Sequence, residues 1–141
     1  MKIRSLRTLL PTLLFAVGAH SAMALNCGSI INSNVTLTAD LQCSSLALSV
    51  VADNLTINLN GHTISCVGGG FGGSCQLPNG PIGIYVSHHN NVQILGPGTI
   101  TGFGIGVLID KGLGVHVKGL TLTGPPQPDV VNNPCGHLRI E

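Results

Sequence analysis

Residues 54–124 repeat one pattern three times, and this repeat limits the fold more than any other feature of the chain. Each copy opens with a short segment in which apolar and polar residues alternate. These segments are Asn54-Leu55-Thr56-Ile57, Asn91-Val92-Gln93-Ile94 and Gly114-Val115-His116-Val117. A second short segment follows, in which hydroxyl residues flank an apolar one. Self-similarity of this kind is the signature of a repeat architecture.

The spacing of the copies locates one insertion. Val115 follows Val92 at a spacing of 23, whereas Val92 follows Leu55 at a spacing of 37, a surplus of 14. One extra residue lies between the first two segments of the first copy, and the rest of the surplus follows Ile64. The stretch after Ile64 is rich in glycine, so we predict an inserted loop over residues 66–80.

Each copy is predicted to contain three short strands. Side chains alternate along a strand, so Val92 and Ile94 face one way and Gln93 faces the other. Strands with one or two inward residues cannot bury a core as hairpins, but stacked coils can. The predicted fold is all-β, a parallel β-solenoid of about four coils over residues 25–124. Residues 34–38, which precede residues 54–58 at a spacing of 20, are predicted to belong to an earlier coil, and residues 46–50 to occupy the place of 84–86 and 107–109.

Residues 1–24 are typical of a secretory signal peptide. A basic leader precedes an apolar run from Leu9 to Ala19, and Ala22-Met23-Ala24 is a small-x-small cleavage pattern. The run is shorter than the roughly 20 residues that span a bilayer, and no membrane span is expected after cleavage. We therefore expect a secreted or periplasmic protein.

Removing the leader changes the charge. Three Lys and Arg residues remain against five acidic residues, a formal charge of −2 with histidine neutral. Nucleic-acid binding then lacks its main driving force, the neutralisation of phosphates by clustered basic residues. We expect no nucleic-acid partner, and no cofactor is indicated.

All five cysteines follow the leader, in a compartment where disulfides persist. Nearest-neighbour pairing would join Cys27 to Cys43 and Cys66 to Cys75, although sequence alone does not fix connectivity. The first pair would tie an N-terminal cap over the first coil, and Cys135 is left over. Residues 125–141 are predicted to be an irregular, proline-rich tail, which either covers the last coil or marks a truncated solenoid.

Two segments carry a resemblance to a known family. Asp53-Asn54-Leu55-Thr56-Ile57-Asn58-Leu59-Asn60-Gly61-His62-Thr63-Ile64 and Gly98-Thr99-Ile100-Thr101-Gly102-Phe103 resemble the parallel β-helix repeat of the pectate-lyase-like superfamily, which includes the NosD-like periplasmic copper-site maturation proteins. The resemblance covers residues 27–124 and implies right-handed winding. It also implies that an enzyme of this class would work in a groove along one face. Neither a calcium-binding acidic set nor paired catalytic carboxylates can be mapped onto this chain.

Outward residues of the first strand are the candidate carbohydrate contacts. They form a polar strip that is able to hydrogen-bond sugar hydroxyls and has a basic end. The residues singled out are Asn58, Gln93, His116 and Lys118.

Two further groups suggest other functions. His88 and His89 at a turn are a candidate copper or zinc site, whereas His62 is expected to be structural. Flanking hydroxyls of the second strand would stack in two columns about 7 Å apart along the strand, with neighbours in a column about 4.8 Å apart from coil to coil. This array is similar to those of β-solenoid ice-binding proteins. This threonine ladder comprises Thr63, Ser65, Thr99, Thr101, Thr121 and Thr123.

The function expected from these residues is a secreted, non-catalytic β-helix module with a structural role or with polysaccharide as its partner. Three alternatives stay open. In the first, the chain is a fragment of a polysaccharide lyase, hydrolase or epimerase whose catalytic coils lie beyond its end. In the second, it is a NosD-like protein that matures a metal site in the periplasm, and in the third, it binds ice through the threonine ladder.

Overall fold

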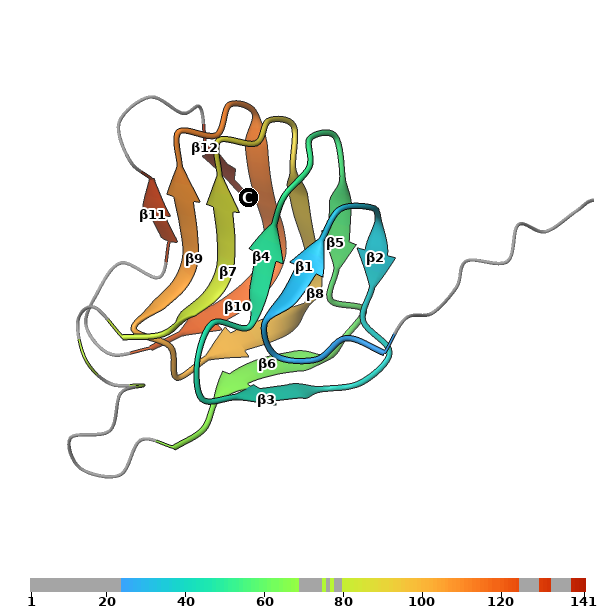
Figure 1. Ribbon diagram of the computed structural model, residues 1–141. Coiled ribbons are helices and arrows are strands. Elements are labelled where there is room, and N and C mark those ends of the chain that lie inside the picture. Colours follow the sequence, from blue (N-terminus) through green and yellow to red (C-terminus); the bar gives the residue numbers. More distant parts are fainter. Residues whose placement is uncertain (1–23, 69–74, 76, 78–79, 125–129, 133–137) are drawn as a thin grey trace, which may run out of the picture.

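The computed structural model describes residues 24–68, 75, 77, 80–124, 130–132 and 138–141 (Figure 1). Nearly all of the predicted signal peptide, the proline-rich start of the tail and Cys135 lie outside these residues. Within the described part, no helix has the length and apolar character needed to cross a membrane.

The described chain is built from short strands joined by turns. In order, the strands are β1 (Ser29–Ile31), β2 (Val35–Thr36), β3 (Leu41–Cys43), β4 (Leu48–Val50), β5 (Thr56–Asn58), β6 (Thr63–Cys66), β7 (Ile82–Ser87), β8 (Gln93–Thr101), β9 (Ile105–Asp110), β10 (Val115–Thr123), β11 (Val130–Asn132) and β12 (Leu138–Ile140). All the pairings between them are parallel. The all-β, parallel fold predicted from the repeat is therefore confirmed.

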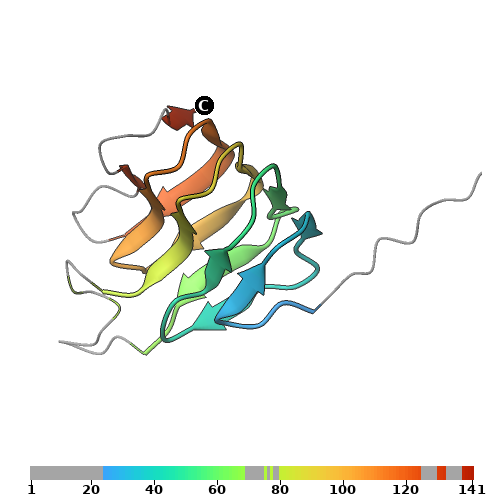
Figure 2. The ribbon, with the colours of Figure 1, turned by 45° about the horizontal axis from the view of Figure 1, so that its top comes forward.

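The strands line three faces of a stack of coils. One sheet has the order β1-β4-β7-β9-β11, and the other has the order β12-β10-β8-β5-β2, with β3 and β6 beside the second halves of β8 and β10. The chain rises along the first sheet, crosses behind it and advances steadily from β1 towards β11, a right-handed winding (Figure 1). The strand order makes four complete coils and part of a fifth, and Figure 2 shows them stacked along one axis. The molecule is a parallel β-helix.

The register of strand pairing agrees with the sequence repeat in the three copies between residues 54 and 124. Gln93 lies opposite His116, and Thr56 lies opposite Gln93, which reproduces the two spacings of the sequence repeat. The earlier coil is different, because Val35 pairs with Ile57 at a spacing of 22, so the predicted spacing of 20 is wrong. A two-residue shift keeps every side chain on the same face of a strand, so the alternating pattern alone does not distinguish these spacings.

The core is a column of aliphatic side chains inside the coils. Ile57, Ile94 and Val117 lie opposite one another in successive coils, and each is at most 2% exposed. Their neighbours along each strand, such as Gln93 next to Ile94, face outwards. Burial of apolar area at about 25 cal/mol per Å² is the main force that holds such coils together, and each coil depends on its neighbours to bury its inward residues.

In the third and fourth coils, two of the predicted strands are one continuous element. β8 and β10 each run for nine residues around a corner of the helix and stay paired on both sides of it. Glycine makes this possible, because a Cβ atom on Gly96 would overlap the carbonyl oxygen of Gly119 in the next coil. The prediction of three separate strands per coil is therefore wrong for these two coils.

The tail is more regular than predicted. β11 pairs with β9, and β12 pairs with β10 in the register Val115–Leu138, so these segments begin a fifth coil. The prediction of an irregular tail over residues 125–141 is thus wrong for both segments. The repeat is interrupted in the sequence at two places. Residues 125–129 separate β11 from the fourth coil, residues 133–137 separate β12 from β11, and the two segments together contain four prolines.

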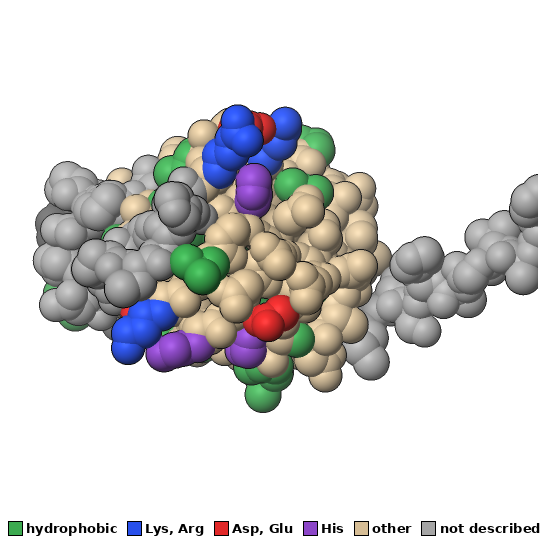
Figure 3. Space-filling model, turned by 90° about the horizontal axis from the view of Figure 1, so that it is seen from above, with side chains coloured by type: hydrophobic (Ala, Val, Ile, Leu, Met, Phe, Trp, Pro, Cys, Tyr) green, Lys and Arg blue, Asp and Glu red, His purple; other side chains and the backbone are tan. Residues whose placement is uncertain are grey.

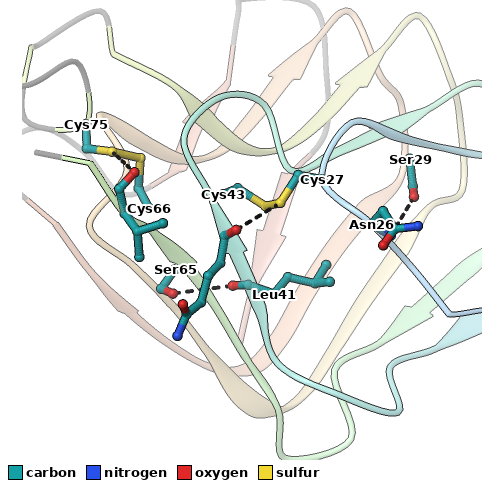
Figure 4. Close-up of a disulfide and its surroundings, with 10 residues drawn as sticks. Asn26, Cys27, Ser29, Leu41, Cys43, Ser65, Cys66 and Cys75 are labelled. Atoms are coloured by element: carbon teal, nitrogen blue, oxygen red, sulfur yellow. Dashed lines mark hydrogen bonds between the residues drawn. A yellow bond between two sulfur atoms is a disulfide. The ribbon is translucent and has the colours of Figure 1, made fainter.

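Two disulfides join the predicted partners, Cys27 with Cys43 and Cys66 with Cys75 (Figure 4). The first ties residues just before β1 to the end of β3, and the second closes the start of the predicted inserted loop. Disulfides that close short loops stabilise a protein mainly by restricting its unfolded chain. Each typically adds about 2–4 kcal/mol to the free energy of unfolding.

Candidate ligand-binding face

The strongest candidate site is the outer surface of the second sheet. Outward side chains of β5, β8, β10 and β12, together with the residue that follows β12, form two columns in register. Neighbours in a column lie about 4.8 Å apart from coil to coil, and the columns lie about 7 Å apart along the strands. One column is Thr56, Gln93, His116 and Arg139, and the other is Asn58, Leu95, Lys118 and Glu141. We call these eight residues the polar face.

Charge is concentrated at the C-terminal end of the polar face. Glu141 Oε2 accepts a hydrogen bond from Lys118 Nζ at 2.9 Å, and Glu141 Oε1 forms an ion pair with Arg139 Nε at 2.7 Å. Figure 3 shows these basic side chains gathered around an acidic one. Hydrogen bonding by Lys118, followed by the charges of Lys118 and Arg139, lowers the pKa of the Glu141 carboxyl. The side chains of Lys118 and Arg139 stay 64% and 69% exposed, so both cations remain open to an approaching ligand.

The four predicted contact residues lie on this face but are not equivalent. Gln93, His116 and Lys118 are exposed, and Gln93 lies directly opposite His116. Asn58 is half-buried, and its Oδ1 accepts the backbone N–H of Asn60 at 2.8 Å. Asn58 therefore helps to form its own turn and is the weakest of the four candidates. Arg139 was not predicted to lie on this face, because an irregular tail was expected there.

The hydroxyl residues of the second strand lie in register on another side of the helix. Thr63, Thr99 and Thr121 form one column, and Ser65, Thr101 and Thr123 form the other. Within the second column, Thr123 Oγ1 donates to Thr101 Oγ1 at 2.7 Å and Ser65 Oγ donates to the carbonyl of Leu41. These six residues form the hydroxyl face, and part of its hydrogen-bonding capacity is used within the protein.

The two turn histidines have different partners. His88 Nδ1 lies 2.8 Å from Ser87 Oγ, whereas His89 Nδ1 lies 3.0 Å from Asp53 Oδ1. Among the residues that the structure describes, no group of three or more His, Cys, Asp or Glu side chains is placed to hold a metal ion. The arrangement of His88 and His89 gives no support to the predicted copper or zinc site.

Asp–His pairs at two corners were not expected from the sequence. Asp53 Oδ1 also accepts the backbone N–H of Asn90, and Asp40 Oδ1 accepts both His62 Nδ1 and the N–H of Thr63. In both pairs the backbone hydrogen bond is the largest cause, and the histidine hydrogen bond the second, of a lowered carboxyl pKa. Both pairs join one coil to the next.

Fold and faces together define the class of protein. The chain is a disulfide-linked parallel β-helix whose sides differ in chemistry, one with amide and charged groups and one with hydroxyl groups. Comparisons with protein-family models, with characterised proteins and with solved structures found no match. The resemblance to the pectate-lyase-like superfamily therefore remains a prediction from the repeat.

Proposed function

We propose that this protein is a non-catalytic β-helix module that acts outside the cytoplasm and binds polysaccharide on its polar face. The observation that carries the proposal is the register of that face, which places Gln93, His116 and Arg139 in line on successive coils. Two disulfides are compatible with an oxidising compartment.

The chemistry of the polar face suits sugar hydroxyls. Its amide, imidazole and ammonium groups offer donors and, on Gln93, an acceptor at regular intervals. A ligand with a regular repeat of hydroxyl groups is able to contact several coils at once, whereas a small ligand would contact only one or two. The basic end at Lys118 and Arg139 further favours a polymer that carries some carboxylate groups.

The positions of three of the five acidic residues support binding rather than hydrolysis. Asp40 and Asp53 are engaged by backbone amides and histidines at two different corners, and Glu141 lies between two cations. A glycosidase needs two carboxyl groups that face one glycosidic bond, and these three residues do not form such a pair.

Binding is tested by isothermal titration of the purified protein with neutral and with uronate-containing oligosaccharides. Changing Gln93 and Lys118 to alanine together should weaken binding at least tenfold, since each lost hydrogen bond contributes about 1 kcal/mol. Thr63→Ala on the hydroxyl face is the matched control and should leave the affinity unchanged. Affinity that is insensitive to the double change, or release of unsaturated or reducing ends from the ligand, would contradict the proposal.

Ice binding is the second candidate, because the predicted threonine columns lie in register over three coils. Its test is thermal hysteresis of the purified protein, compared with Thr99→Lys. Absence of hysteresis at high protein concentration would remove this candidate, and a loss confined to Thr99→Lys would support it over polysaccharide binding.

A further inference from the structure

His116 lies in the middle of the charged part of the polar face. It is exposed, and its register neighbours are Gln93 on one side and Arg139 on the other. Lys118 points outwards from the same strand two residues further along, which separates the two side chains by about 7 Å along the strand. Figure 3 shows a histidine beside the basic side chains here. An anionic group on this part of the face is therefore within reach of His116 as well as of Lys118.

The imidazole of His116 is not held by a partner in the way that the charged groups around it are. Lys118 and Arg139 both contact Glu141, whereas His116 makes no hydrogen bond to another residue in the described part of the chain. After the hydrogen bond from Lys118 and the charges of Lys118 and Arg139, the charge of His116 is a further cause of the lowered pKa of the Glu141 carboxyl. His116 thus belongs to the charged cluster but keeps its ring nitrogens for a ligand.

The net charge of this cluster depends on pH through His116. Histidine is the side chain that changes its charge between about pH 5 and 8, whereas lysine and arginine side chains stay cationic over that range. Glu141 stays anionic there because its pKa is lowered. The side chains of Lys118, Arg139 and Glu141 supply two positive charges and one negative charge, a formal charge of +1, and protonation of His116 raises it to +2.

The other elements packed against β10 add no net charge. β8 contributes Gln93 and Leu95, neither of which ionises. β9 contributes Asp110, and the turn between β9 and β10 contributes Lys111, whose formal charges cancel. Near neutral pH, the charge that an approaching ligand meets on this part of the face is therefore changed by His116 rather than by its neighbours.

We propose that His116 is the specificity-determining residue of the polar face and makes it select carboxylate-bearing ligands more strongly in mild acid than at neutral pH. This role rests on the proposed binding of polysaccharide. The protonated ring donates a charge-assisted hydrogen bond to a ligand carboxylate. The neutral ring still donates one N–H to a carboxylate or to a sugar hydroxyl. Loss of the proton therefore weakens the preference for charged ligands without abolishing binding.

Isothermal titration with a matched pair of ligands tests the selectivity. One ligand is an oligosaccharide that contains uronate units, and the other is the same oligosaccharide with its carboxyl groups reduced to alcohols. The uronate form should bind about two- to fivefold more tightly at about pH 5.5 than at about pH 7.5, the size expected for one exposed ion pair. The reduced form should bind equally well at both. An equal pH response of the two ligands, or tighter binding of the uronate form at the higher pH, would overturn the proposal.

Three variants assign the pH response to one residue. His116→Gln keeps a hydrogen-bond donor but no titrating group, so it should bind the uronate ligand with no pH response. His116→Lys carries a fixed charge and should bind that ligand tightly at both pH values. His88→Asn is the matched control, because His88 is exposed in a turn outside the polar face and its positive φ of 59° suits asparagine. It should keep the full response, and a response that persists in His116→Gln or disappears in His88→Asn would refute the role of His116.

The same titrations separate this proposal from the proposed function. If neither ligand binds at either pH, polysaccharide binding fails and the role of His116 fails with it. If both ligands bind, and Gln93→Ala with Lys118→Ala weakens them, but the affinity for the uronate form does not change with pH, only the role of His116 is refuted.

Discussion

At the scale of single residues, Asp40 and Asp53 show how one coil is fixed to the next. Each carboxylate accepts a backbone N–H and a histidine N–H from the following coil, and each has a lowered pKa for that reason. Because these acceptors are charged, the turns they hold depend on pH.

The stability contribution of these carboxylates should be lost in acid. A lowered folded-state pKa means that the contribution is complete above the ordinary carboxyl pKa of 3.8 and disappears as the pH falls through the lowered value. The free energy of unfolding should therefore fall more steeply below about pH 4 for the natural protein than for the double variant Asp40→Asn, Asp53→Asn. Parallel curves from denaturant titrations at each pH would contradict this explanation.

Asn54 and Asn91 adopt the left-handed backbone conformation, with positive φ. Asn54 and Asn91 occupy equivalent turn positions with φ of 57° and 54°, and Gly114 takes the same place in the next coil with φ of 65°. The two asparagines also hydrogen-bond each other at 3.0 Å. Asparagine and glycine are the residues that adopt left-handed backbone most readily.

Two substitutions separate the backbone effect from the hydrogen bond. Asn91→Ala loses both and should destabilise the protein by about 1–3 kcal/mol. Asn91→Gly loses only the hydrogen bond and should cost clearly less, as the natural glycine in the next coil suggests. Thermal and denaturant unfolding would measure the stability of the two variants. Equal losses of stability in both would show that the backbone conformation at residue 91 does not matter.

At the scale of the elements, stability comes from the stacked inward residues. Ile94 is fully buried between Ile57 and Val117 of the adjacent coils. Ile94→Ala should cost about 2–5 kcal/mol in the free energy of unfolding, the range for truncating a buried aliphatic side chain.

Ile30→Ala is the matched control for that change. Ile30 is 67% exposed, so the same truncation should change stability by less than about 0.5 kcal/mol. Similar losses for Ile94→Ala and Ile30→Ala in urea titrations would be inconsistent with the observed register.

Much of this element structure could be predicted from the sequence because it rests on alternation. Gln93 and His116 were placed correctly on one outer column, and the two disulfides follow nearest-neighbour pairing. Shifting a strand by two residues leaves every side chain on the same face, so alternation does not distinguish the two registers. The predicted spacing of the first coil was therefore two residues too short. Alternation also fails to reveal β11 and β12, because proline-containing segments interrupt the repeat before each of them. Arg139 and its contact with Glu141 were therefore not predicted.

At the scale of the whole molecule, the residues that hold the β-helix together are distinct from those on its outer faces. Inward residues of every coil contribute to one core, while each side of the helix presents a different chemistry in regular steps. Changes on the polar face should therefore alter ligand binding with little effect on stability.

The most direct test of the proposed function is to map the bound ligand by nuclear magnetic resonance. Backbone amide signals of the isotopically labelled protein would be followed as a binding oligosaccharide is added. The account predicts that shifts concentrate at Gln93, His116 and Lys118 and are small at Thr63 and Thr99. Shifts confined to the threonine columns, or no shift with any neutral or uronate-containing oligosaccharide, would contradict it.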